Sequence, residues 1–300
     1  MTRLCLGTVQ FGMDYGVQGG KRPAVEDAVA MLDYATQNGV DAIDTAAAYG
    51  TAEEVVGEFL GRRTVPRESM QVISKFGTKV FEGATPTEYG SRLRAAAETS
   101  LRRIGTDYLD AYICHVPDAV GDAAIIEAMA ALKAAGLARH VGFSVYDPEQ
   151  TRACLKAEAV DFIQSPYSFL DRRMETSGAL GEAKARGVDL HTRSAFVQGL
   201  MLMKPEAIPE HLEAARPIIR ELEEACADAG LTRRALALAY VKANTDVSHL
   251  VFGVDNLSQL KEIVEDFAKP VDSVALKAIA DRFAKVDPSI FLPNNWNKKK

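Results

Sequence analysis

The chain has 300 residues, a length that suits either two domains or one large α/β barrel. Hydrophobic residues make up 47% of it and charged residues 25%, the composition of a globular protein that can bury a large core. The formal net charge of -6 argues against a general nucleic-acid binder, because such proteins normally present a basic face.

The four cysteines lie far apart in the sequence and form no CxxC pair. This spacing predicts buried, reduced thiols rather than a disulfide framework or a metal site. The first residues run directly into a predicted strand without a signal-peptide pattern, and no apolar run approaches the length of a membrane span. We therefore expect a cytoplasmic protein with neither a membrane nor a nucleic-acid partner.

Short apolar runs typical of buried strands alternate with longer stretches of helical periodicity along almost the whole chain. The predicted strands are residues 4–6, 40–44, 70–75, 109–115, 140–144, 162–165, 188–192 and 249–252. The helices predicted to follow them are residues 23–37, 52–60, 86–103, 123–135, a short helix from about 147, 178–185, the pair 218–229 and 233–242, and 257–267.

Eight strand–helix units in this order imply parallel strands joined by crossover helices, and they predict a closed (β/α)8 barrel, the TIM-barrel architecture. A doubly wound open sheet is the alternative. One more helix is expected at residues 273–284, followed by a C-terminal tail from about residue 285 to residue 300. No Pro/Ser-rich linker divides the chain, so residues 1–300 are predicted to form a single domain.

Polar side chains stand at the carboxyl ends of several predicted strands, which in a barrel would face one shared pocket. Asp44 ends the second predicted strand, and Tyr49 lies on the loop just beyond it. Lys75 ends the third predicted strand and His115 the fourth. Taken singly, each has a simpler explanation: a capping carboxylate, a surface phenol, a buried ion-pair partner and a core histidine.

Together these four side chains form a chemically consistent proton-delivery group. A phenol has a pKa near 10, and a nearby ammonium lowers it. Asp44 can hold Lys75 in place and offset its burial, while His115 can orient a substrate oxygen by hydrogen bonding. Such a group would protonate a carbonyl oxygen as hydride reaches the carbon. A Schiff-base lyase that uses Lys75 as its nucleophile is another possibility from the same residues.

The sequence resembles the aldo-keto reductase family over nearly its full length. The resemblance rests on Asp-Thr-Ala-x-x-Tyr-Gly at residues 44–50, on Ile73-Ser-Lys75, on Ser100-Leu-x-x-Ile-Gly-Thr-Asp-Tyr-Leu-Asp110 leading to His115, and on Gly136-Leu137 through Gly142-Phe-Ser144. The family is a (β/α)8 barrel that binds nicotinamide cofactors without a Rossmann domain. In agreement, no GxGxxG motif follows a predicted strand here.

The resemblance implies an NAD(P)H-dependent reductase of aldehydes or ketones. Tyr49 would be the general acid and Lys75 the modulator of its pKa, with Asp44 in support and His115 orienting the substrate. Ser144 and Gln164 match positions that hold the nicotinamide carboxamide. The other positions implied to contact NADP(H) or NAD(H) are Gly7, Thr8, Arg193, Ser194, Gln198, Gly199, Gly253, Val254, Asp255 and Gln259.

Three positions depart from the family pattern. Val145 stands where Asn is common, which removes one expected carboxamide contact. Arg193 stands where an aromatic residue often stacks on the nicotinamide; its guanidinium can stack in the same way, or it can pair with a carboxylate at the barrel mouth. Asp255 lies where a helix N-cap belongs, after the last predicted strand. A carboxylate there would repel a 2′-phosphate and accept hydrogen bonds from a free ribose hydroxyl, so we expect NADH to be favoured.

The ends of the chain and the pocket loops complete the sequence-based expectations. The first strand begins almost at Met1, which leaves little room for the N-terminal hairpin common in the family. The tail, through Trp296, is expected either to fold over the pocket or to pack on the surface. A mixed apolar and polar pocket for sugars or small aldehydes is expected from Met13, Tyr15, Val116, Pro117, Tyr146, Tyr167 and Trp296.

A cofactor-binding regulatory or sensor barrel with little turnover is the alternative function, since the family contains channel-associated subunits. The intact group of Asp44, Tyr49, Lys75 and His115 favours an enzyme that acts on a small-molecule carbonyl substrate. The sequence does not identify the physiological substrate or the oligomeric state.

Overall fold

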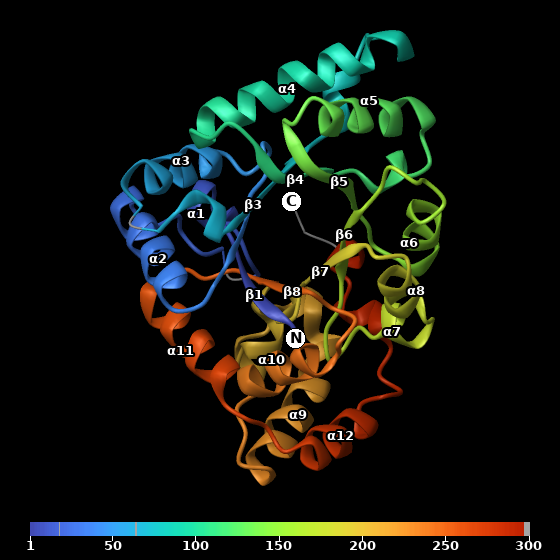
Figure 1. Cartoon of the computed structure of the whole chain (residues 1–300). Helices are drawn as coiled ribbons and strands as arrows, with labels where there is room; N and C mark the ends of the chain where they lie inside the picture. The colour runs from blue at the N-terminus through green and yellow to red at the C-terminus, as the bar shows by residue number, and fades with distance from the viewer. Residues whose placement is uncertain (18, 64, 297–300) are drawn as a thin grey trace.

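The computed structural model describes residues 1–17, 19–63 and 65–296. Eight parallel strands form a closed barrel in sequence order, with β8 pairing back to β1 (Figure 1). The strands are β1 Arg3–Gly7, β2 Ala42–Asp44, β3 Gln71–Phe76, β4 Leu109–Cys114, β5 Ala138–Ser144, β6 Phe162–Pro166, β7 Asp189–Arg193 and β8 His249–Phe252. The predicted barrel is therefore confirmed, and the open sheet is wrong.

Helices surround the strands as an outer ring, and α9, α10 and α12 gather on one side of it (Figure 1). The α-helices are α1 Val9–Gly12, α2 Val25–Gln37, α3 Ala52–Arg62, α4 Tyr89–Ile104, α5 Ala123–Ala134, α6 Pro148–Cys154, α7 Arg173–Thr176, α8 Ala179–Ala185, α9 Arg216–Asp228, α10 Arg233–Ala243, α11 Leu257–Ala268 and α12 Ser273–Arg282. Helix α12 is the additional helix expected after the last unit.

Short polar side chains determine where several helices begin. Asp122 accepts hydrogen bonds from the backbone N–H groups of Ala124 and Ile125 at the start of α5. Asp147 does the same for Gln150 at the start of α6, where Pro148 occupies the first turn. The strands are nearly continuous buried runs, as expected when a parallel sheet is covered on both faces.

Three 3-10 segments lie in the long connection between β7 and α9, where the sequence analysis assigned no structure: η5 Val197–Leu202, η6 Pro205–Ala207 and η7 Glu210–Ala215. Their apolar side chains pack with α9, α10 and α12 into a hydrophobic cluster separate from the main core. We call this cluster the second core; its members include Leu200, Met203, Leu222, Leu236 and Phe283.

The interior of the barrel is apolar at mid-height and polar at both ends. Its apolar layer consists of Cys5, Ala42, Ile73, Ala111, Ile113, Phe162 and Val251. Buried polar side chains lie at the carboxyl ends of the strands and again at their amino ends, for example Lys75 and His249.

Within the described residues, no helix combines the length and the hydropathy that a membrane span requires. The last four residues of the expected C-terminal tail, 297–300, lie outside the described residues.

Candidate active site

A cavity of about 750 Å³ opens at the carboxyl ends of the strands. This volume lies in the range of small-molecule and cofactor sites. Three of the four predicted catalytic residues line it: Asp44, Tyr49 and His115. The fourth, Lys75, lies behind them with a side chain that is 0% exposed. The structure therefore brings all four together, with Lys75 in a supporting position.

Lys75 is held by a bidentate ion pair. Its Nζ donates to the two carboxylate oxygens of Asp44 at 2.6 and 2.7 Å and to the carbonyl oxygen of Thr45 at 2.9 Å. These bonds occupy the three N–H donors of the ammonium, so the contact with the Tyr49 hydroxyl is longer, at 3.5 Å. A Schiff-base nucleophile must be an accessible neutral amine, which this geometry does not provide.

Burial and charge act in opposite directions on these groups. Burial alone lowers the pKa of the Lys75 ammonium, but the Asp44 carboxylate outweighs it, so this pKa is raised overall. Burial raises the pKa of the Tyr49 phenol, and Lys75 offsets only part of that rise. Lys75 acts on the Tyr49 pKa in the expected direction, but desolvation exceeds the effect of the ammonium, so this pKa is raised overall. Tyr49 stays protonated at neutral pH, the state that a general acid requires.

Two glycines position the Tyr49 loop. A Cβ at Gly12 would lie 1.7 Å from the carbonyl oxygen of Tyr49 and 2.5 Å from the backbone nitrogen of Ala52. Gly50 has a φ of +57°, and a Cβ there would lie 2.2 Å from the carbonyl oxygen of Gly12. The end of α1 and the Tyr49 loop are thus in direct backbone contact, which fixes the loop against the barrel.

Gly12→Ala should displace Tyr49 and lower turnover, because backbone atoms cannot make room for the added methyl group. We expect a loss of stability of about 1–3 kcal/mol, measured by urea unfolding, together with a loss of kcat. Gly61→Ala is the matched control, since Gly61 lies in α3 with nothing within 4 Å of an added Cβ. Equal kcat in the two variants would contradict this account of the Gly12 contact.

His115 faces Tyr49 from the end of β4. The two rings lie 5.5 Å apart at an interplanar angle of 81°, an edge-to-face contact. Burial, reinforced by the Lys75 charge, lowers the pKa of His115 to about 4. The imidazole is therefore neutral at neutral pH and can donate one hydrogen bond to a substrate oxygen.

His115→Gln should reduce the loss of stability in acid. Unfolded histidine has a pKa near 6.5 and folded His115 one of about 4, so the unfolded state binds more protons below about pH 6.5. The stability that the neutral ring confers is lost as the pH falls from about 6.5 to about 4. Between pH 7 and pH 5 the unfolding free energy of the variant should fall by about 1–2 kcal/mol less than that of wild type. His211→Gln, at an exposed position, is the control and should follow wild type.

Most of the residues expected to contact the cofactor line the same cavity. They are Gly7, Thr8, Gln164, Arg193, Ser194, Gln198, Gly199, Gly253, Asp255 and Gln259. Ser144 and Val254 are each 1% exposed and lie outside this lining as the structure describes it. The cavity lining also includes Gln10 and Arg234, which the sequence analysis did not select.

Gln164 and Arg193 have defined partners. The Gln164 amide donates to Asp44 at 2.8 Å, which satisfies one donor and fixes the orientation of the amide. Arg193 donates to the carbonyl oxygen of Val145 at 3.1 Å and lies over the Tyr146 ring, 4.5 Å from its centroid. The guanidinium thus stacks on an aromatic ring, and no carboxylate partner is found for it in the described part of the chain.

The backbone after β7 enters the left-handed region at three non-glycine residues. Ser194, Val197 and Gln198 have φ values of 69°, 51° and 53°. This conformation is unfavourable for most side chains and especially for a β-branched valine. Ser194 and Gln198 line the cavity, so the strained backbone forms part of the site.

Helix α11 begins beside the cavity, but the expected cap assignment was off by one residue. The N-cap is Asn256, whose side chain accepts a hydrogen bond from the backbone N–H of Gln259. Asp255 is exposed and lies at the rim of the cavity. Its backbone N–H donates to the Gln259 side-chain oxygen at 2.9 Å, and its carboxylate accepts a hydrogen bond from the Gln259 amide at 3.3 Å. Nearby Arg234 pairs with Glu262 and Asp266, which neutralise its charge.

Comparison with known proteins agrees with this geometry. Residues 3–281 match the model of the Aldo/keto reductase family. The NADH-specific methylglyoxal reductase of Escherichia coli (strain K12) is 28% identical over 258 residues, which cover 75% of this chain and 78% of that protein. The probable voltage-gated potassium channel subunit beta of Arabidopsis thaliana is 28% identical over 304 residues, which cover 91% and 90%.

Among solved structures, the holo form of the aldo-keto reductase AKR11C1 from Bacillus halodurans has the same fold. Its TM-score is 0.76 at 24% identity, over 95% of this chain and 93% of that one. The family match extends over nearly the whole chain and includes Asp44, Tyr49, Lys75 and His115. The chain therefore belongs to the aldo/keto reductase family and is an NAD(P)-dependent oxidoreductase.

Proposed function

We propose that this protein reduces a small aldehyde or ketone and that Tyr49 is its general acid. The observation that carries the proposal is the grouping of Tyr49, Asp44 and His115 on one cavity, with Lys75 ion-paired behind them. The reduced nicotinamide cofactor, when bound, supplies the hydride. Every other part of the proposed mechanism concerns the proton and the placement of the substrate.

The proton moves from Tyr49 Oη to the carbonyl oxygen as negative charge develops there. The raised pKa keeps the proton on the phenol until that moment, and the Lys75 ammonium, 3.5 Å away, stabilises the phenolate that remains. Asp44 keeps Lys75 charged and in position. Neutral His115 donates a hydrogen bond that orients the carbonyl.

The cavity residues fit a dinucleotide. Gly199, with a φ of +89° and nothing within 4 Å of an added Cβ, presents open backbone, which permits close approach of a phosphate. At Gly253 the Gln10 amide lies where a Cβ would be, so Gln10 would contact a group bound there. Among the described residues, Gln164 has no partner for its second amide N–H or its side-chain carbonyl oxygen, and these groups would hold the carboxamide. Arg193 would stack on the nicotinamide, as it stacks here on Tyr146.

The proposed preference is for NADH. Asp255 places an unneutralised carboxylate at the rim of the cavity, whereas Arg234 is already paired with two carboxylates. Both features disfavour a 2′-phosphate. The Escherichia coli relative is named as NADH-specific, which supports the same choice here.

Asp255→Asn should improve NADPH binding relative to NADH by about tenfold, because it removes one repulsive charge at constant shape. The measurement is the dissociation constant of each reduced cofactor by fluorescence titration. Glu68→Gln is the control, since this exposed residue precedes β3 at the opposite end of the barrel. A strong NADPH preference in the wild-type protein would contradict the proposal.

The proposed substrates are small carbonyl compounds, including short aldehydes and sugars. Tyr15 and Tyr146 line the cavity as expected, whereas the other five expected pocket residues do not: Met13, Val116, Pro117, Tyr167 and Trp296. Tyr167 is buried beside Tyr240, and Trp296 donates its indole N–H to the Ile290 carbonyl oxygen within the second core. Trp296 therefore packs away from the pocket, and Pro293 is the tail residue that lines it.

A screen of cofactor oxidation tests the proposed function. Short aldehydes, 2-oxoaldehydes, sugars and aromatic ketones would each be offered with NADH and with NADPH. Turnover that disappears in Tyr49→Phe is the expected result. Turnover that persists in that variant would reject the mechanism.

The second candidate is a cofactor-binding regulatory barrel, favoured by the similarity to a protein named as a probable potassium channel subunit beta. Tight cofactor binding without turnover on any carbonyl in the screen would support this alternative. The complete proton-delivery group favours the reductase.

A further inference from the structure

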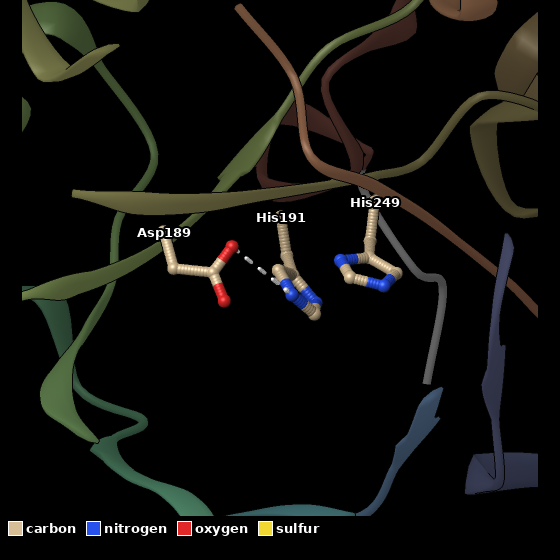
Figure 2. A group of neighbouring side chains, drawn as sticks. All are labelled: Asp189, His191 and His249. Carbon is tan, nitrogen blue, oxygen red and sulfur yellow. Dashed lines mark ion pairs between the residues drawn. The ribbon is translucent and has the colours of Figure 1, made fainter. Parts of the chain in front are cut away.

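Two histidines outside the active site share the amino-terminal end of the barrel interior. His191 on β7 and His249 on β8 are register partners, and both are 0% exposed. Their ring centroids lie 4.2 Å apart. Asp189 precedes His191 by two residues and so lies on the same face of β7. Figure 2 shows the three side chains in a row, with His191 between the other two.

Three of the four ring nitrogens lack a hydrogen-bond partner among the described residues. Both nitrogens of His191 and Nδ1 of His249 are unpaired within the described part of the chain. The nearest acceptor, Asp189 Oδ1, lies 3.6 Å from His191 Nε2, beyond normal hydrogen-bond distance. Buried polar atoms of this kind are destabilising unless another group satisfies them. A cation bound by their lone pairs would be such a group.

We propose that Asp189, His191 and His249 bind one divalent transition-metal ion such as Zn²⁺. One potential ligand atom from each residue lies within 4.8 Å of the others. Two ligands of a single zinc ion are at most about 4.2 Å apart, because each bond is about 2.1 Å long. Small side-chain rotations therefore suffice to form the site. Two imidazoles with one carboxylate suit Zn²⁺, Ni²⁺ or Fe²⁺ better than Mg²⁺ or Ca²⁺.

Neighbouring side chains orient two of the three ligands. His249 Nε2 contacts the Asp41 carboxylate at 3.1 Å, which places the ring proton on Nε2 and leaves Nδ1 free for a metal. Ser248 Oγ donates a hydrogen bond to Asp189.

The site is reachable from the amino ends of the strands and adjoins the proposed active site, since His191 is the register partner of Gln164 on β6. The Asp189 side chain is 22% exposed, which provides a path for an ion from the amino ends of the strands. Val251 follows His249 on the same face of β8 and belongs to the apolar layer at mid-height. A metal here would connect β7 to β8. The sequence did not indicate it, because His249 stands on β8, 58 residues after His191 on β7, and only the strand register brings the two together.

Titration of chelator-treated protein tests the site. Calorimetry with ZnCl₂ should show one equivalent bound, and CoCl₂ should give the visible absorption of a nitrogen- and oxygen-ligated ion. Asp189→Asn and His249→Gln should each weaken binding at least tenfold, and Asp41→Asn, which removes an orienting group, by about 10- to 100-fold. His140→Gln is the matched control, since His140 lies on β5 at the same end of the barrel, outside the proposed ligand set.

Each result of these titrations either supports the metal site or contradicts it. Retained cofactor binding and an unchanged circular dichroism spectrum would show that the variants are folded. Stoichiometric binding lost in Asp189→Asn and His249→Gln but kept in His140→Gln supports the site. Absence of stoichiometric binding, or equal affinity in wild type and His249→Gln, would overturn it and leave water as the partner of these rings.

Discussion

Replacing Tyr49 with phenylalanine is expected to lower kcat by roughly 10²- to 10⁴-fold, the usual contribution of a positioned general acid. The variant loses only the hydroxyl, so the ring contacts with His115 and Lys75 remain. Cofactor affinity should therefore change little. The measurement is steady-state turnover together with a cofactor titration on the same preparation.

The control for this variant is Tyr34→Phe, which removes a phenol from α2 on the outside of the barrel. It should keep wild-type kcat and KM. If Tyr49→Phe also kept its turnover, the proton would have to come from another group. His115 would then be the first candidate, because it is the nearest other proton donor on the cavity.

Breaking the ion pair between Lys75 and Asp44 is expected to affect both activity and stability. Lys75→Met leaves the Asp44 carboxylate buried without its cation, and Asp44→Asn leaves the ammonium without its anion. Losing one member of a buried pair typically lowers the unfolding free energy by about 3–5 kcal/mol. Turnover should also fall steeply, since the phenolate of Tyr49 would lose its stabilising charge.

A double-mutant cycle distinguishes the two effects. The double variant Asp44→Asn/Lys75→Met should recover part of the lost stability, because no uncompensated charge stays buried, but it should not recover activity. Urea unfolding and kcat would be measured for all four proteins. Lys277→Met, which breaks an exposed pair with Asp281 on α12, is the control and should change stability by less than about 1 kcal/mol. Additive stability losses in the cycle would show that the pair is not coupled.

The sequence was sufficient to predict the barrel and the grouping of Asp44, Tyr49, Lys75 and His115 at one end of it. Strand–helix alternation is a local signal, and strand ends converge in any closed barrel, so Asp44, Lys75 and His115 could be grouped without coordinates. The net direction of the Tyr49 pKa could not be predicted in this way, because it depends on how completely neighbouring atoms exclude water from the phenol.

Other features depend on geometry that leaves little trace in sequence. Ser194, Val197 and Gln198 have left-handed backbone conformations although none of them is a glycine, so the sequence does not indicate this geometry. Asn256, not Asp255, is the N-cap of α11. Asp and Asn are both favourable N-cap residues, so the sequence alone does not distinguish these two adjacent positions. The pairing of His191 with His249 follows from register between strands of different units.

The second core supports one side of the cavity, and the barrel supports the other. Tyr49 and Asp44 rest on the barrel, whereas Gln198, Gly199 and Leu202 stand on η5, whose apolar side chains pack with α9, α10 and α12. Each side is therefore supported by a different set of packed residues. Opening of the second core alone would release the dinucleotide side and leave the proton donor in place. Such an architecture separates exit of the cofactor from integrity of the catalytic group.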